Sequence, residues 1–591
     1  MNADNRIMKM KINILFMFLV FFVISIVITY PLIFHLSDYI LGKGDELLIA
    51  WIINWVSYAL IQQPLSLFQA NIFYPYANTL SFSDPHLTSA IITLPFVFLN
   101  EPAMAYNVNL ILSLAFLGFS TFLLVKYMTK NSLTSFISAL LIICSPFILG
   151  RMFQLQVVSI QWVPLSILFF LKFLNEKKFS FLLFSNIFLL IQVANTFLPG
   201  YYLILCYLII VVFYWSKKRL DIRSLLNIKT FVLLTITLSL ILIIGRPYFQ
   251  TSKKFNYVRD IRDTIHFANR PEYFLYPNDK TRLQPILLKA LYSKDNGPYK
   301  YDGYFGLAFL LLGLFVFIRY IFGKTIDHQD KKNQTFYMPL FIIISAVAFI
   351  LSLGPVWQWG GRVIKEPFII PLPYALLYYL IPGFNGIRNS ARWEVLSILT
   401  LAVIIGIGLS GFYQKKSRCF QITATIFFSL AIFLEINLPL KYAKIPKKED
   451  FPPVYSFINT LPKNAVIIEM PIFSWDMLPY SFTEFEREYF STAHFRKTVN
   501  GYSAFSPPQW EQQARFLIKN FPDNVSVEQL KKTGVKYIVV HLNDYLLLLN
   551  KRFQVDGQSI AEPKAVIDRL NDNPRVKLIK RFGNDYVYQI N

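Results

Sequence analysis

The chain of 591 residues lacks several features that a soluble enzyme of this length carries. Only 16% of its residues are charged, against about 25% in soluble domains. Its C-terminal part, residues 441–591, contains no P-loop, no G-x-G-x-x-G and no G-x-S-x-G, which argues against nucleotide-dependent and α/β-hydrolase chemistry there. Its three cysteines and six histidines form no zinc-binding spacing, and no cysteine follows Cys419, so we expect neither a zinc site nor a disulfide framework in the C-terminal part.

Long apolar runs take the place of the missing charge. Hydrophobic residues make up 54% of the chain and aromatic residues 17%, which is typical of a protein that crosses a membrane many times. The net charge of +23 would suit a nucleic-acid partner, but most of the basic excess lies in short loops between apolar runs, where it sets membrane topology. The composition predicts a mostly α, polytopic helical membrane protein that contacts membrane lipids and no nucleic acid.

About eleven apolar runs are long enough to span a bilayer as helices. They are Ile12–Phe34, Ala103–Val125, Leu133–Gly150, Val157–Phe173, Phe179–Thr196, Gly200–Trp215, Thr230–Gly245, Tyr304–Ile318, Phe336–Leu353, Arg392–Tyr413 and Gln421–Leu438. The segment His86–Asn100 is apolar but short, so it is either a further span or an interfacial segment. Charge decides against a span, because the basic loops then all face the cytoplasm. The N-terminus is predicted to be cytoplasmic and the C-terminal part external.

The spans divide the chain into two predicted domains. Residues 1–440 form a transmembrane domain with a large first external loop, 35–102, and a long polar external loop, 247–303. The composition changes at a charged linker, and residues 441–591 are predicted to form a small external α/β domain. Its expected elements are the helices Val454–Thr460 and Val527–Thr533, the strands Ala465–Glu469 and Val535–Val540, and a hairpin of Arg575–Lys580 and Asp585–Ile590.

The first external loop carries two acidic signals in otherwise aliphatic and aromatic surroundings. The first is Gly44-Asp45-Glu46 and the second is Ser83-Asp84-Pro85-His86. Carboxylates beside a membrane are costly unless they serve a purpose. We therefore interpret the loop as a membrane-surface active site; the alternative is an ordinary extracellular loop with solvated acids.

The stretch between these signals predicts a helix that lies on the membrane. Leu47–Ile61 would be roughly 22 Å long as a helix, short of the ~30 Å hydrocarbon core. Trp51, Trp55 and Tyr58 fall on one helical face, as in helices that lie in the headgroup plane. This interfacial helix would form the floor of the active site.

A second external segment, Gly354–Arg392, ends in a pair of arginines. Its prolines leave Tyr374–Ile381 too short to cross, so this part is expected to dip into or lie along the outer face. Arg388 and Arg392 follow at i and i+4, where the next helix is predicted to begin. They either bind a ligand at headgroup depth or snorkel to the interface as structural residues.

The spans contain almost no ionisable residue apart from Glu435. Ion-coupled transporters usually keep carboxylates or charged pairs near the midplane, so coupled transport is disfavoured. The charges gather instead on the external face, which favours chemistry there on a substrate embedded in lipid. The alternatives are a non-catalytic transporter or lipid flippase, for which we see no inverted repeats, and an envelope assembly scaffold.

The arrangement resembles the GT-C superfamily of polyprenyl-phosphate-sugar-dependent glycosyltransferases, which includes protein O-mannosyltransferases, aminoarabinose transferases and oligosaccharyltransferases. The shared features are a first helix, a large external loop with an acidic motif near its start, interfacial helices, further spans and an external C-terminal domain. Within it, the bacterial YfhO-like branch shows similar stretches to Phe73-Tyr74-Pro75, Ser83-Asp84-Pro85-His86, Ile381-Pro382-Gly383-Phe384 with Arg388 and Arg392, and Asn500-Gly501-Tyr502-Ser503. The chain departs from better-known members in having Asp-Glu rather than a fuller acidic pair and in lacking a W-W-D-type motif.

The resemblance implies an inverting glycosyltransferase of the bacterial cytoplasmic membrane that uses a lipid-linked sugar donor. Asp45 would be the general base, with Glu46 as the nearest substitute, and Asp84 and His86 would hold the acceptor or support the base. Arginines would bind the donor phosphate, and the candidates are Arg388, Arg392, Arg246 and Arg270. No nucleotide is needed at the external face, no metal ligand is assigned, and a divalent cation is allowed by analogy with the oligosaccharyltransferases. The sugar, the acceptor (a glycan, lipid or protein) and the oligomeric state are left open.

Overall fold

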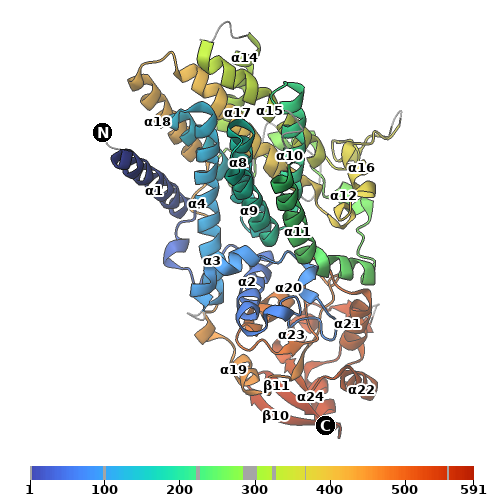
Figure 1. The fold of residues 1–591 in the computed structure, drawn as a ribbon. Coiled ribbons are helices and arrows are strands. Elements are labelled where there is room, and N and C mark those ends of the chain that lie inside the picture. Colours follow the sequence, from blue (N-terminus) through green and yellow to red (C-terminus); the bar gives the residue numbers. More distant parts are fainter. Residues whose placement is uncertain are drawn as a thin grey trace. The chain divides into compact units, whose positions relative to one another are not determined.

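The structure is a computed structural model that describes residues 3–97, 101–220, 227–283, 303–322, 328–365, 368–555 and 558–591. The chain is mostly helical and divides into two compact units (Figure 1). The first unit comprises Met1–Phe34, Asn109–Ile244 and Val258–Lys441, and the second comprises His35–Val108, Gly245–Tyr257 and Tyr442–Asn591. The second unit thus unites the first predicted external loop with the predicted C-terminal domain.

Helices occupy the positions that the apolar runs predict. In the described part of the chain, eight helical stretches are long and apolar enough to cross a membrane. Four are single helices: α4 (Pro102–Thr129), α10 (Leu198–Ser216), α11 (Ile228–Phe255) and α18 (Arg418–Glu435). Ser132–Gly150 combines α5 (Ser132–Ile143) with α6 (Pro146–Gly150), and Leu155–Glu176 combines α7 (Leu155–Val158) with α8 (Trp162–Glu176); Thr335–Ser352 lies within α15 (His328–Ser352), and Ser390–Tyr413 ends in α17 (Glu394–Tyr413). Three further apolar helices, α1 (Ala3–Ile28), α9 (Phe179–Asn195) and α14 (Leu307–Phe322), lie at the remaining predicted spans. The prediction of a polytopic helical membrane protein is confirmed, and the orientation of its termini stays a prediction.

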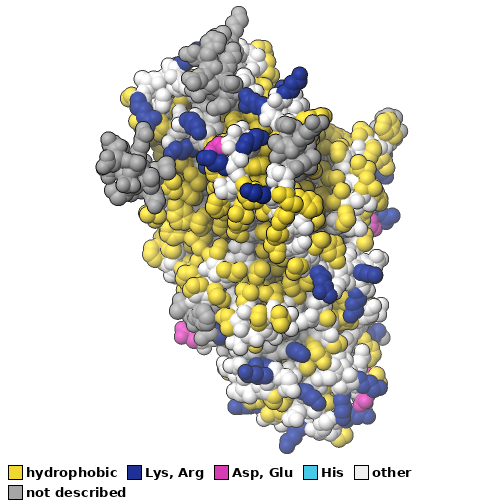
Figure 2. Space-filling view, viewed as in Figure 1, with side chains coloured by type: hydrophobic (Ala, Val, Ile, Leu, Met, Phe, Trp, Pro, Cys, Tyr) yellow, Lys and Arg dark blue, Asp and Glu magenta, His cyan; other side chains and the backbone are white. Residues whose placement is uncertain are grey.

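Two of these helices expose most of their surface although they are apolar. Only 22% of the apolar stretch of α11 and 17% of that of α18 are buried inside the protein. Exposed apolar helices are stable where their surroundings are apolar as well, so these faces contact lipid. Figure 2 shows hydrophobic side chains gathered in a broad band over the helical part of one face.

The stretch that includes α17 is one of three apolar stretches of the first unit that are 83% buried. Two of its glycines let neighbouring helices approach closely. A Cβ at Gly406 would lie 2.7 Å from the Val125 side chain of α4, and one at Gly408 would lie 2.2 Å from Val316 of α14. Small residues at such contacts allow helices to pack in a bilayer, where no hydrophobic force draws them together.

Glu435, at the end of α18, has a structural role. Its carboxylate accepts hydrogen bonds from the backbone N–H groups of Leu307 and Ala308, at 3.0 Å for the latter, and so caps the N-terminus of α14. A carboxylate interacts favourably with the positive end of the helix dipole there. An acid engaged in capping a helix gives no support to ion-coupled transport.

The second unit is built on a five-stranded mixed sheet with strand order β10-β11-β7-β5-β6. β5 (Val466–Met470) runs parallel to β6 (Lys497–Thr498) and β7 (Tyr537–His541), whereas β11 (Asp585–Ile590) is antiparallel to β7 and to β10 (Val576–Phe582). The helices α19 (Pro453–Thr460) and α22 (Asn524–Thr533) coincide with the two predicted ones. The predicted mixture of helices and strands and the terminal hairpin are therefore present, whereas the boundary of a separate domain, 441–591, stays a prediction.

The first loop is hydrogen-bonded to the edge strand β6 and to the residues that follow it. The backbone N–H of Thr498 donates to the Asn71 carbonyl at 2.7 Å, and the N–H groups of Phe73 and Tyr74 donate to the carbonyls of Asn500 and Thr498 at 2.9 Å each. Position 501 requires a glycine, because a Cβ on Gly501 would lie 2.8 Å from the Phe73 ring. The Phe73-Tyr74-Pro75 stretch therefore packs against, and hydrogen-bonds to, the Asn500-Gly501-Tyr502-Ser503 stretch.

The helix between the acidic signals does not lie on a membrane surface. α2 (Asp45–Gln62) packs against α3 (Leu87–Val97) and α20 (Phe482–Ser491) within the second unit. Its residues Trp51 and Trp55 are only 1% and 3% exposed, and both donate indole hydrogen bonds within the first loop. The predicted interfacial floor is wrong, because the aromatic face of this apolar helix is buried by other parts of the second unit rather than by headgroups.

The predicted orientation can be tested by labelling. In a chain whose three native cysteines are replaced, single cysteines at the exposed positions Lys43 and Asn524 should react with a membrane-impermeant thiol reagent added outside intact cells. A cysteine at the exposed Lys217 should not, because the basic loops are expected to face the cytoplasm. Labelling at Lys217 with protection at Asn524 would reverse the orientation.

Candidate functional site

The candidate site in the second unit consists of two neighbouring carboxyl groups at the N-terminus of α2. Asp45 and Glu46 occupy its first turn, after Gly44. The positive end of the helix dipole and the unpaired backbone N–H groups of the first turn favour carboxylates there. The Gly44 N–H donates to Glu46 Oε2 at 3.1 Å, and a Cβ at Gly42 would lie 2.6 Å from Glu46 Oε1. Backbone and glycine thus fix the Glu46 carboxyl in place.

The two carboxyl groups differ in environment. Glu46 is 4% exposed, and burial raises its pKa to about 7; the Gly44 hydrogen bond opposes this shift, and the neighbouring Asp45 adds to it. Asp45 is half-buried and so stays within reach of a ligand. The Tyr106 phenol of α4 interacts electrostatically with both. A buried carboxyl that exchanges its proton near neutral pH beside a more accessible one suits acid–base chemistry.

The second acidic signal lies near the opposite end of α2. α3 begins directly after His86 and meets α2 at Ser57, whose hydroxyl donates to the Ala90 carbonyl. Ser57 follows Asp45 by about twelve residues, or about 18 Å of helix. The structure therefore does not bring Asp84 and His86 together with the first acidic pair.

Asp84 and His86 have their own surroundings. The Tyr248 hydroxyl donates to the Ser83 carbonyl at 2.8 Å, and the Asp84 carboxylate interacts electrostatically with the same phenol. His86 is 1% exposed, and burial lowers its pKa to about 3, so its imidazole is neutral at physiological pH. A neutral, buried imidazole is suited to packing more than to proton transfer, and the role of either residue towards an acceptor stays a prediction.

A polar pocket opens beside the strand pair that precedes α2. β1 (Tyr39–Ile40) pairs with β4 (Ala443–Lys444). The adjacent cavity, of about 460 Å³, is lined by Asp38, Lys444, Ile445, Pro446, Lys447 and Asp450. Carboxylates accept and ammonium groups donate hydrogen bonds, so this mixed lining suits hydroxyl groups, which do both. From Ile40 to Asp45 the chain spans at most about 17 Å, which places the pocket within reach of the acidic pair.

The C-terminal part of the second unit contains a buried ionic network that the sequence did not predict. The His541 imidazole bridges Glu469 and Asp585 at 2.9 and 2.8 Å; although burial lowers its pKa, these bonds raise it to about 9. Arg487, 3% exposed, pairs with Glu484 at 2.9 Å. The network connects β5, β7 and β11 with α20, so its role is structural. Such scattered residues carry no local sequence signal.

In the first unit the two predicted arginines lie in a loop rather than on a helix. α16 (Pro373–Leu380) is too short to cross, as predicted. Arg392 lies in a 3₁₀ turn, Ser390–Trp393, and α17 begins only after it, so the predicted helical i, i+4 pair is wrong. Arg388 and Arg392 are both half-buried, and the Arg388 guanidinium stacks 4.7 Å over the Phe267 ring.

The two other arginine candidates fall in different units. Arg246 is exposed on α11 in the second unit. Arg270 is 5% exposed in the first unit, where its guanidinium lies 5.2 Å from the Tyr273 ring centre. The preceding residue, Asn269, donates a hydrogen bond to the carboxylate of Glu394 at the start of α17. Of these two arginines, Arg270 is thus the one that lies in the same unit as the Arg388–Arg392 loop.

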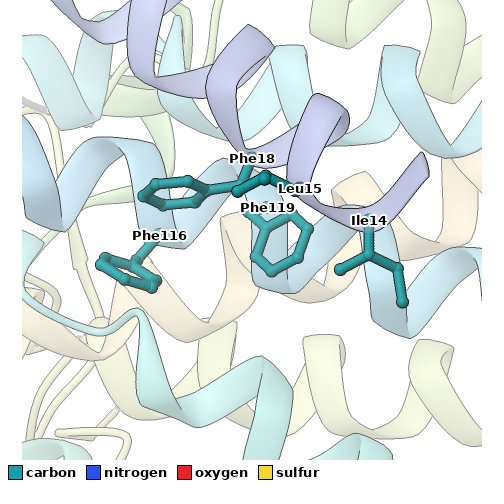
Figure 3. A pocket seen from close by; sticks show the side chains of 5 residues that line it. All are labelled: Ile14, Leu15, Phe18, Phe116 and Phe119. Carbon is teal, nitrogen blue, oxygen red and sulfur yellow. The ribbon is translucent and has the colours of Figure 1, made fainter. Parts of the chain in front are cut away.

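An apolar groove lies between α1 and α4 (Figure 3). Its volume is about 280 Å³, and it is lined by Ile14, Leu15, Phe18, Phe116 and Phe119. Ile14 and Leu15 are exposed on an apolar membrane helix, so they face lipid. The lining carries no polar group for chemistry, and we assign the groove to contact with lipid chains.

The residues present do not fit the divalent cation that the resemblance allows. Among the residues that the structure describes, no three histidine, cysteine, aspartate or glutamate side chains lie close enough together to hold a metal ion. Asp45 and Glu46 supply two carboxyl groups, and Glu46 is already bonded to the Gly44 N–H.

A family profile described as Domain of unknown function (DUF6311) matches residues 15–432. No curated protein matches the sequence. Among solved structures, the arabinofuranosyltransferase AftD from Mycobacteria is similar with a TM-score of 0.50 and 11% identity, over 97% of this chain and 41% of AftD. An oligosaccharyltransferase from Archaeoglobus fulgidus is also similar, with a TM-score of 0.42 and 14% identity, over 90% of this chain and 68% of that one. ArnT from Cupriavidus metallidurans, bound to undecaprenyl phosphate, is similar with a TM-score of 0.38 and 11% identity, over 98% of each chain.

The likeness to AftD indicates a shared fold. This chain spans 41% of the length of AftD. The profile that matches is that of DUF6311, and the nearer likeness to YfhO-like proteins stays a prediction.

The buried Glu46 carboxyl predicts a pH-dependent difference in stability. A carboxyl whose pKa rises on folding, from 4.5 to about 7, destabilises the folded chain progressively as the pH rises through that window. Glu46→Gln, which stays neutral, should therefore stabilise the chain above pH 7 by at most about 3 kcal/mol and have no effect below about pH 4.5. Thermal unfolding of the purified variant at both pH values checks this, with the exposed Glu449→Gln as control. If Glu46→Gln changes the unfolding temperature equally at both pH values, the change in stability does not come from the ionisation of Glu46.

Proposed function

Because the chain belongs to the DUF6311 family, a domain of unknown function, its activity has to be inferred from its site, and we propose that it is an integral membrane glycosyltransferase. It transfers a sugar from a polyprenyl-phosphate donor to an acceptor at the external face of the cytoplasmic membrane. The observation that carries the proposal is the Asp45–Glu46 carboxyl pair at the N-terminus of α2, in a membrane fold shared with a glycosyltransferase.

Asp45 acts as the general base in an inverting transfer. As an acceptor hydroxyl attacks C1 of the donor sugar, the new O–C1 bond forms and the bond from C1 to the phosphate oxygen breaks. The hydroxyl proton passes to the Asp45 carboxylate, and the lipid phosphate leaves as an anion. No nucleotide takes part, since the phosphate of the lipid donor is itself the leaving group.

Glu46 positions the base and sets the charge beside it. Burial favours its protonated form, so near neutral pH a proton on Glu46 removes a like charge next to Asp45. Its bond from the Gly44 N–H holds the turn in which Asp45 lies. It is also the nearest substitute base when Asp45 is removed.

Arg388 and Arg392 bind the donor phosphate, with Arg270 in the same unit. A guanidinium holds phosphate oxygens in a bidentate fork and stabilises the departing anion. Both side chains are half-buried, and the Nε of Arg392 is buried without a hydrogen-bond partner among the described residues. A partly buried cation with an unused donor is suited to an anionic ligand.

The acceptor is a hydroxyl-bearing glycan, lipid or protein. The mixed lining of the pocket beside β1 and β4 supports a ligand rich in hydroxyl groups. Ion-coupled transporters keep their carboxylates near the membrane midplane, whereas the Asp45–Glu46 pair lies on α2, which is not among the candidate membrane-spanning helices of the described residues. We therefore prefer the transferase.

Transfer in membrane vesicles tests the base. Vesicles that contain the chain receive radiolabelled undecaprenyl-phosphate sugar, and the label in acceptor is counted. Asp45→Asn, which keeps the shape but loses the base, should lower the rate roughly 10²- to 10⁴-fold with donor binding nearly intact. The exposed Asp568→Asn is the matched control and should transfer normally. A rate for Asp45→Asn within a factor of a few of wild type would remove Asp45 from the role.

Donor titrations test the arginines. Arg392→Lys keeps the charge but loses the bidentate fork, so it should weaken donor affinity, and Arg388→Ala should weaken it more, by about 1–3 kcal/mol. Arg569→Lys, at an exposed position of the C-terminal segment, should leave affinity unchanged. If Arg392→Lys shows the wild-type apparent KM at normal protein levels, both arginines return to a structural role.

A further inference from the structure

Beneath the Arg388–Arg392 loop lies a set of buried polar groups whose hydrogen-bonding capacity is unused. Asn389 is 4% exposed, and neither Nδ2 nor Oδ1 of its amide has a partner in the described part of the chain. The hydroxyl of the fully buried Ser390 and the Oδ1 of Asn269, a residue that is 1% exposed, likewise have no hydrogen-bond partner among the described residues. Native proteins rarely leave such groups unpaired, because each loses its bonds to water on burial.

These groups belong to one cluster formed by three loops. A Cβ at Gly354 would lie 3.1 Å from Ser390 Oγ and 2.6 Å from the Ala268 side chain, so the residue before Asn269 lies beside Ser390. Asn269 also donates through Nδ2 to the Glu394 carboxylate, one turn beyond Ser390. Asn269, Asn389 and Ser390 therefore lie in one part of the first unit, around Gly354 and the start of α17.

The unused groups include both donors and acceptors. Asn389 Nδ2 and the Trp393 indole N–H donate, whereas the amide oxygens of Asn389 and Asn269 accept. A phosphate group only accepts and would leave both amide oxygens unpaired. A sugar hydroxyl donates and accepts, so the mixed set fits a polyol rather than an anion.

We propose that the cluster of Asn269, Asn389 and Ser390 binds hydroxyl groups of the donor sugar. The inference rests on the proposed function, because it takes Arg388 and Arg392 to hold the donor phosphate. The sugar is joined to that phosphate through C1, and Asn389 and Ser390 lie between the two arginines in the chain. The half-buried Arg388 directly precedes the cluster, so the cluster lies just beneath the surface of the loop.

The test measures how much the sugar adds to the binding of the lipid phosphate. The full chain in detergent is titrated with undecaprenyl phosphate and with its glucosyl, galactosyl, mannosyl and N-acetylglucosaminyl derivatives. The sugar increment is the Kd of the bare lipid phosphate divided by that of the derivative that binds wild type most tightly. Asn389→Ala and Ser390→Ala should each reduce the increment roughly 5- to 10-fold and change the affinity for undecaprenyl phosphate by less than about two-fold.

Asn186→Ala is the matched control. Asn186 is also 4% exposed in the first unit, but its Nδ2 donates to the Leu182 carbonyl at 2.9 Å. Its replacement should leave the sugar increment unchanged and lower the unfolding temperature. Asn389→Ala and Ser390→Ala remove groups without partners, so both should unfold at the wild-type temperature or above it.

Three outcomes decide against the proposal. If ordered water satisfies the cluster, both variants lose stability and keep the full sugar increment, which overturns the inference. A wild-type chain that binds no derivative more tightly than undecaprenyl phosphate also overturns it. A chain that binds neither undecaprenyl phosphate nor any derivative overturns the proposed function, and the inference with it.

Discussion

The backbone hydrogen bonds between Asn71–Tyr74 and Thr498–Asn500 are the contact on which the second unit depends. They attach the first loop to the edge of the sheet, and the Trp51 indole donates a hydrogen bond to the side chain of Asn71 in the same region. With α2 fixed by this burial, the carboxyl pair at its N-terminus is held relative to the sheet. The C-terminal segment is thus part of the framework of the candidate site and not an appended domain.

Much of the fold could be predicted from the sequence because a bilayer permits few solutions. Backbone groups in lipid must pair internally, so apolar runs of sufficient length become helices, and all the predicted spans coincide with helices. The prediction for α2 was wrong for a related reason. Aromatic residues such as Trp51 and Trp55 give the same pattern whether headgroups or another part of the protein covers them, and here the cover comes from a segment more than 400 residues away.

The candidate site could be predicted only in part. Asp45 and Glu46 are recognisable because two acids in an apolar loop form a local signal, but their separation from His86 follows from how α3 packs along α2. The unused amide of Asn389 carries no signal, since asparagine is common in loops and its lack of partners depends on distant residues. The place of Arg392 before α17 likewise depends on a 3₁₀ turn that spacing alone does not reveal.

The configuration of the transferred sugar tests the central claim most directly. If Asp45 removes the acceptor proton while the lipid phosphate departs from the opposite face of the ring, every transfer inverts C1. NMR spectroscopy of the product made by the purified chain, compared with the donor, should therefore show the inverted anomeric configuration. Retention of configuration, or donor that crosses the membrane without forming a new glycosidic bond, would contradict the account.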